Sequence, residues 1–118
     1  MVKVIIDGDA CPVVNSVIEL TKGTGIFVTV LRSFSHFSHQ IQPEHLKTVY
    51  VDDGPDAVDY KIVQLAKKED IVITQDYGLA SLLIDKVHIV MHHKGSIYRA
   101  DNIQALLDQR YLLSLIHI

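Results

Sequence analysis

Short hydrophobic runs rich in β-branched residues alternate along the chain with segments of helical periodicity. The runs predict five strands, at 2–6, 26–31, 47–52, 71–74 and 87–91. The helical spacing predicts helices at 12–22, 56–68, 77–86 and 103–113. Because a helix that connects two strands of one sheet leaves them parallel, this order predicts an α/β fold. We expect a three-layer α/β/α domain with a mostly parallel five-stranded sheet.

Length and composition limit the domain organisation and the location. With 118 residues the chain is long enough for one core, and we expect a single domain over 1–118. No run approaches the roughly 18 consecutive apolar residues of a membrane span, and the N-terminus lacks the pattern of a secretion signal. We therefore expect a cytoplasmic protein without a membrane partner.

The formal net charge of −3 limits how nucleic acid is bound. Nonspecific affinity for nucleic acid comes mainly from cationic side chains on phosphates, and this chain has no overall excess of them. An RNA partner would need a local basic patch or bridging metal ions. The sequence leaves the oligomeric state open.

Two segments depart from the alternating pattern, and one residue type is notably scarce. Residues 32–44 have no sustained period, and we expect a long loop whose aromatic rings either stack on bases or pin the loop to the domain. Residues 112–118 are mostly aliphatic and do not continue the alternating pattern. Cys11 is the single cysteine, so no internal disulfide is expected.

Aspartates follow three of the predicted strands at their carboxyl ends. Asp7 and Asp9 come after the first strand. Asp56 and Asp59 begin the helix that follows the third strand, and Asp76 comes after the fourth. Because parallel strands present their carboxyl ends at one edge of the sheet, we expect these side chains to converge there.

Converging carboxylates predict a metal ion. Two like charges a few ångströms apart repel by roughly 4 kcal/mol at an effective dielectric constant near 20, so a cluster needs a cation or raised pKa values. Oxygen ligands without a cysteine cluster favour a hard ion, Mg²⁺ or Mn²⁺. We therefore predict that Asp7, Asp9, Asp59 and Asp76 are the metal-binding and catalytic residues.

Most of the acids near these strand ends also have a structural explanation, which is weakest for Asp7 and Asp9 because they flank a glycine at the end of a buried strand. Asp56 and Asp76 stand where helix N-caps belong, and Asp59 completes something like a capping box with Asp56. Asp52 and Asp53 fit an ordinary turn. Asp56 is therefore assigned a supporting role near the site.

Three further residues are candidates for contact with the substrate or with the acids. Thr74 offers a hydroxyl close to Asp76 that could bind phosphate or an ordered water, although a threonine is also common at a strand end. Lys61 and Lys94 could hold a phosphate backbone, and the alternative for both is a solvated surface position.

Four ordered segments carry a family resemblance: D-G-D-A-C-P at 7–12, D-A-V-D-Y at 56–60, I-V-I-T-Q-D-Y-G-L-A at 71–80 and H-K-G-S-I-Y-R-A-D-N-I-Q-A-L-L-D-Q-R at 93–110. Together they resemble the YaiI/YqxD (UPF0178) family of bacterial proteins over nearly the whole chain. That family is similar to PIN-like domains, which are metal-dependent nucleases. The resemblance implies a PIN-like fold with acidic motifs at Asp7 and Asp9, at Asp56 and Asp59, and at Asp76. It carries over no activity established for the family itself. Members of that family usually continue into a polar, glycine-containing tail, so we expect the aliphatic residues 112–118 to reflect truncation, a frameshifted end or an interface.

Three functions are compatible with these residues. In the first, a Mg²⁺- or Mn²⁺-dependent nuclease acts on RNA, and one acid orients the attacking water. In the second, a phosphohydrolase of the haloacid dehalogenase type uses Asp7 as nucleophile and Asp9 as acid or base. In the third, a non-catalytic module retains the metal and binds RNA or protein. The converging acids and the resemblance favour the first.

Overall fold

The computed structural model describes residues 2–8, 14–33, 43–52 and 57–116, with side chains as far as Gln109. The predictions for Asp9, Cys11, Asp53 and Asp56 lie outside the described residues, as does most of the predicted loop at 32–44.

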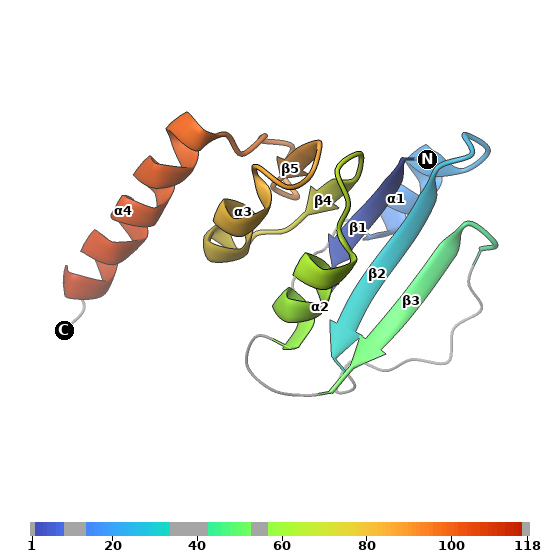
Figure 1. The fold of residues 1–118 in the computed structure, drawn as a ribbon, viewed down its shortest axis with the longest axis horizontal. Coiled ribbons are helices and arrows are strands. Elements are labelled where there is room, and N and C mark those ends of the chain that lie inside the picture. The colour runs from blue at the N-terminus through green and yellow to red at the C-terminus, as the bar shows by residue number, and fades with distance from the viewer. Residues whose placement is uncertain (1, 9–13, 34–42, 53–56, 117–118) are drawn as a thin grey trace.

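The described strands form one five-stranded sheet in which all neighbouring strands are parallel (Figure 1). Its order is β3-β2-β1-β4-β5. The strands are β1 (Lys3–Asp7), β2 (Phe27–Ser33), β3 (Leu46–Val51), β4 (Ile71–Ile73) and β5 (Ile89–Met91). The chain builds one half of the sheet outward from β1 and then crosses back to β4 on the other side of β1. Ligands commonly bind at the carboxyl ends of strands where the strand order reverses in this way.

The helices cover both faces of the sheet, as Figure 1 shows for α1 behind it and α2 in front. Val17 packs in the cluster that contains Val4 and Ile6 of β1, whereas Ile5 belongs to the cluster on the other face. The cluster that contains Ile5 also includes Ile62, Leu83 and Ile103, which come from three different helices. The helices are α1 (Val14–Thr21), α2 (Ala57–Leu65), α3 (Tyr77–Leu83) and α4 (Ala100–Ile116). The predicted three-layer α/β/α architecture is confirmed. No helix among the described residues is long and apolar enough to cross a lipid bilayer.

Several elements end elsewhere than predicted, and for β2 and α2 local hydrogen bonding explains the difference. β2 extends into the predicted loop, since Arg32 and Ser33 pair with the last residues of β3. α2 ends at Leu65 rather than at 68. There the backbone N–H of Lys67 donates to the Asp70 carboxylate at 2.8 Å, and this bond closes a turn.

α4 is longer at both ends than the predicted helix at 103–113. It begins at Ala100, because the Asn102 side chain accepts a hydrogen bond of 2.8 Å from the backbone N–H of Arg99. This contact is one half of a capping box, with the side chain in the first turn reaching back to the residue before the helix. The helix then continues to Ile116.

Candidate functional site

Asp7 ends β1 at the carboxyl edge of the sheet, beside the point where the strand order reverses. The residue is only 8% exposed. A buried carboxylate requires hydrogen-bond donors, because desolvating the charge without them is costly. Asp7 Oδ2 accepts a hydrogen bond of 3.1 Å from the Thr74 hydroxyl, which lies just after β4. Asp7 is therefore part of the buried interior beneath the edge.

Gly8 lets the chain leave β1 in close contact with β2. Its backbone N–H donates to the Leu31 carbonyl at 2.8 Å. A Cβ atom at this position would lie 2.5 Å from Val30 Cγ1 and 2.9 Å from the Leu31 carbonyl oxygen, closer than side chains tolerate. The glycine that follows Asp7 is therefore required by packing against β2.

Thr74 joins the ends of β1 and β4. Its hydroxyl donates to Asp7 and accepts from the backbone N–H of Asp76 at 3.0 Å. The Thr74 carbonyl in turn accepts a hydrogen bond of 3.3 Å from the Tyr98 hydroxyl. Thr74 is 1% exposed, so it acts as a buried connector and has no surface to offer a substrate phosphate.

Asp76 is the N-cap of α3. It has extended backbone angles, and its Oδ1 accepts from the N–H groups of Gly78 at 2.9 Å and Leu79 at 3.2 Å. The capping explanation for Asp76 is therefore correct. These two capping bonds use only Oδ1 of the carboxylate.

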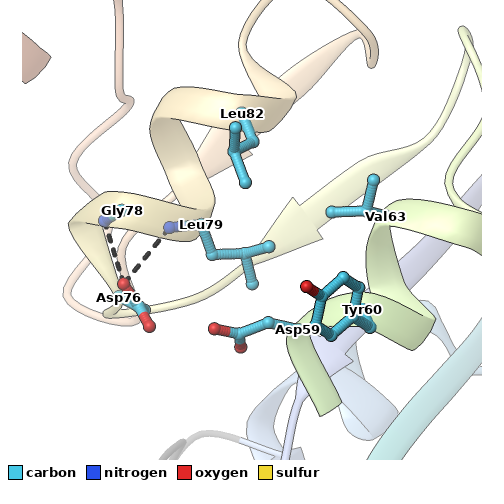
Figure 2. A pocket seen from close by; sticks show the side chains of 7 residues that line it. All are labelled: Asp59, Tyr60, Val63, Asp76, Gly78, Leu79 and Leu82. Atoms are coloured by element: carbon cyan, nitrogen blue, oxygen red, sulfur yellow. Dashed lines mark hydrogen bonds between the residues drawn. The ribbon is translucent and has the colours of Figure 1, made fainter. Parts of the chain in front are cut away.

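A pocket of about 500 Å³ lies between α2 and α3 (Figure 2). One side is acidic, and Figure 2 shows the carboxylates of Asp59 and Asp76 directed toward one another. The other side is mostly apolar. The pocket is lined by Asp59, Tyr60, Val63, Asp76, Gly78, Leu79 and Leu82. Two of the predicted site residues, from the first turn of α2 and the N-cap of α3, thus share one cavity.

Tyr98 packs beneath the acidic side of the pocket. Its ring lies edge-on to Tyr77, with 5.9 Å between centroids. Burial, followed by the neighbouring Tyr77 and Asp76, raises the pKa of Tyr98 to about 12. The phenol is therefore protonated at neutral pH and can donate to the Thr74 carbonyl.

The basic turn after β5 stands apart from the pocket lining. His92 stacks on His93 with 4.2 Å between ring centroids, and its Nδ1 accepts from the backbone N–H of Lys94 at 3.1 Å. Burial, then His93 and Lys94, lower the pKa of His92, which favours the neutral imidazole. Lys94 is exposed, and neither it nor Lys61 of α2 lines the pocket.

The described residues bring the predicted acids together in pairs. Asp59 and Asp76 share the pocket, and Asp7 connects to Asp76 through Thr74. Within the part of the chain that the structure describes, no group of three or more histidine, cysteine, aspartate or glutamate residues is arranged to hold a metal ion. Asp9, the fourth predicted ligand, falls outside that part.

Sequence comparison places this architecture in a family. Residues 5–117 match the family model described as "Uncharacterized BCR, YaiI/YqxD family". The chain belongs to this family. The matched range includes the strand ends, the pocket and the buried link through Thr74.

Close relatives come from staphylococci and are named only as UPF0178 proteins. A relative from Staphylococcus epidermidis is 87% identical over 109 residues, which cover 92% of this chain and 73% of the relative. A relative from Staphylococcus haemolyticus is 75% identical over 94% of this chain and 75% of its own length. One from Staphylococcus aureus is 73% identical over 95% of this chain and 74% of its own. No solved structure matches the chain.

Sequence reasoning missed two parts of this site. It did not identify the apolar side of the pocket, although Tyr60 stands directly beside Asp59 in the sequence. An aromatic residue at an outward helical position next to a candidate acid was the available signal. It also missed Tyr98. This residue lies 24 positions after Thr74, and only the tertiary fold brings the two into contact.

Proposed function

We propose that this protein is a divalent-metal-dependent nuclease that acts on RNA, with Asp9, Asp59 and Asp76 as its metal-binding acids and Asp7 as the buried residue that positions Asp76 through Thr74. The observation that supports the proposal most strongly is the pair of carboxylates, Asp59 and Asp76, directed into one open pocket (Figure 2). The pocket lies where α/β sheets commonly bind ligands. Membership of the family adds no activity, so the proposal depends on the chemistry of these side chains.

The residues at the pocket fit a hard divalent cation. Mg²⁺ keeps several of its waters and is typically held by one or two carboxylates together with substrate phosphates. Asp59 and Asp76, which both line the pocket, supply such a pair. Two negative charges that share a pocket also repel each other unless a cation is bound between them.

The side chains at and around the pocket would have different roles in cleavage. When bound, Mg²⁺ or Mn²⁺ supplies positive charge that neutralises a phosphodiester and acidifies a bound water. Asp59 would orient the attacking water. Asp7 is 8% exposed and would act through Thr74, whose hydroxyl donates a hydrogen bond to it. The same hydroxyl accepts a hydrogen bond from the backbone N–H of Asp76 and so holds the N-cap residue of α3 in position. Lys61 and Lys94 remain candidates for phosphate contact outside the pocket.

The burial of Asp7 favours this mechanism over the phosphohydrolase alternative. A phosphatase nucleophile needs an exposed carboxylate oxygen with a path for the phosphoryl group. At 8% exposure, and with Oδ2 hydrogen-bonded to Thr74, Asp7 offers little access. Its position suits a residue that orients Thr74 and Asp76 better than one that attacks a phosphoryl group.

The experiment is release of acid-soluble nucleotides from single-stranded RNA in the presence of Mn²⁺. Asp76→Asn is the decisive variant, because asparagine keeps an oxygen that can cap α3 but removes the charge. We expect at least a hundredfold loss of activity, in line with the loss of a group that stabilises transition-state charge. Asp85→Asn, an exposed residue that does not line the pocket, is the matched control.

Two results would contradict the nuclease proposal. The first is equal activity of Asp76→Asn and Asp85→Asn. The second is a wild-type protein whose melting temperature rises with Mn²⁺ but which releases no nucleotide. The second result would favour the non-catalytic, metal-retaining module, because a ligand stabilises the folded state whether or not chemistry follows.

A further inference from the structure

The pocket has an exposed apolar side that the metal chemistry does not use. Tyr60 is 77% exposed and Leu82 is 67% exposed, and both line the pocket from neighbouring helices. Val63 and Leu79 also line the pocket. Large apolar side chains that remain in water at a cavity wall contribute little to folding, and such surfaces commonly mark binding sites.

Tyr60 stands next to the acidic pair. It follows Asp59 directly in α2, and Figure 2 shows the side chains of both residues at the pocket. A volume of about 500 Å³ is within the range of sites that hold ligands of small-molecule size. The cavity therefore combines a place for a cation and its phosphate with an aromatic surface a short distance away.

We propose that Tyr60 is a stacking platform for one unpaired base of a single-stranded RNA substrate. This inference rests on the proposed nuclease function and specifies its substrate class. A base is planar and stacks on aromatic rings, and its phosphate lies within one nucleotide of the ring. The cation held by Asp59 and Asp76 binds the phosphate, and the apolar side of the pocket binds the base. A purely apolar peptide carries no phosphate group for the cation to bind.

The same geometry selects against a duplex. Bases in an A-form helix are paired and stacked on each other, so they cannot present a face to Tyr60 without being extruded. Tyr60 would thus be a specificity residue for unpaired RNA, with cleavage carried out by the neighbouring carboxylates.

The experiment measures binding separately from cleavage. Fluorescence anisotropy is recorded in the presence of Mg²⁺ with a labelled oligoribonucleotide of about ten residues, a length that covers a typical single-strand site. Its bridging phosphodiester oxygens are replaced by methylene groups, so that attack by water has no leaving group and the strand stays intact. Tyr60→Ala removes the ring, and Tyr60→Phe keeps it while removing the hydroxyl. Phe27→Ala is the matched control, because Phe27 is a 49% exposed aromatic at the amino end of β2, on the opposite edge of the sheet.

We expect Tyr60→Ala to weaken binding by about 5-fold to 150-fold, the range that corresponds to loss of one stacked base. The affinities of Tyr60→Phe and Phe27→Ala should stay within about twofold of that of the wild type, because both variants keep an aromatic ring at position 60. The annealed duplex should bind more weakly than the single strand. Wild-type affinity in Tyr60→Ala, an equal loss in Phe27→Ala, or equal binding of the duplex would each overturn the inference.

Failure of the inference and failure of the nuclease proposal are distinguishable. If wild-type protein cleaves RNA and Tyr60→Ala cleaves it with unchanged KM and kcat, stacking is refuted and the nuclease proposal stands. If the single strand binds in a Tyr60-dependent way but wild-type protein cleaves nothing, stacking is supported and the nuclease proposal fails.

Discussion

Replacing Thr74 with valine tests whether its hydroxyl holds the two strand ends together. The substitution keeps the side-chain shape but removes a donor to Asp7 and an acceptor for the N–H of Asp76. A hydrogen bond to a charged group contributes about 1.5–3 kcal/mol to stability, and a neutral one about 0.5–1.5 kcal/mol. Since Thr74 is 1% exposed, water cannot easily replace either contact. We expect Thr74→Val to lower the free energy of unfolding by about 2–4 kcal/mol.

Urea unfolding followed by circular dichroism measures this loss. With a urea dependence of about 1–3 kcal/mol per molar, the midpoint should fall by roughly 1–3 M. Thr74→Ser is the matched control, because it keeps the hydroxyl and removes only a methyl group, at a cost of about 1 kcal/mol. If valine and serine destabilise the protein equally, the hydroxyl does not connect Asp7 to Asp76 and this part of the account is wrong.

Three further predictions concern residues around the same edge. Gly8→Ala should destabilise the protein by about 1–3 kcal/mol in urea unfolding, because the new methyl group overlaps Val30 and backbone; unchanged stability would contradict the close packing of β1 on β2. Asp76→Ala should cost about 1 kcal/mol, or about 4 °C in thermal unfolding, whereas Asp76→Asn should cost only a few tenths, and equal losses would refute the capping role. The pKa of Tyr98 is raised to about 12 from 10.0, so its contribution to stability is fully present below pH 10 and is lost as the pH rises toward 12. Between pH 10 and 12 the free energy of unfolding of the wild type, measured with urea, should therefore fall relative to that of Tyr98→Phe. A difference between the two proteins that does not change over this pH range would contradict the burial of the phenol.

The sheet and its helices were predictable because they follow local periodicity. Runs such as 71–73 are apolar on successive residues, which is typical of a strand covered on both faces. The capping role of Asp76 was also readable, since an aspartate immediately before a helix is a common N-cap. The ends of the elements were less predictable, because side chains such as Asp70 and Asn102 decide them through specific contacts.

The arrangement of the acids was only partly predictable. Parallel strands explain why Asp7 and Asp76 approach one another, but the strand order that makes β1 and β4 neighbours is not encoded in any single segment. The sequence also does not reveal that Asp7 turns into the interior toward Thr74 while Asp59 turns into a pocket. Side-chain direction at a strand end depends on contacts with distant residues, and these are set by packing of the whole domain.

The most direct test of the central claim is a crystal structure of the protein soaked in Mn²⁺, with anomalous diffraction used to locate the ion. The account predicts an anomalous peak in the pocket between α2 and α3, within about 2.2 Å of a carboxylate oxygen from both Asp59 and Asp76. A fully soaked crystal with no peak in this pocket, or with manganese bound only at other residues, would contradict it.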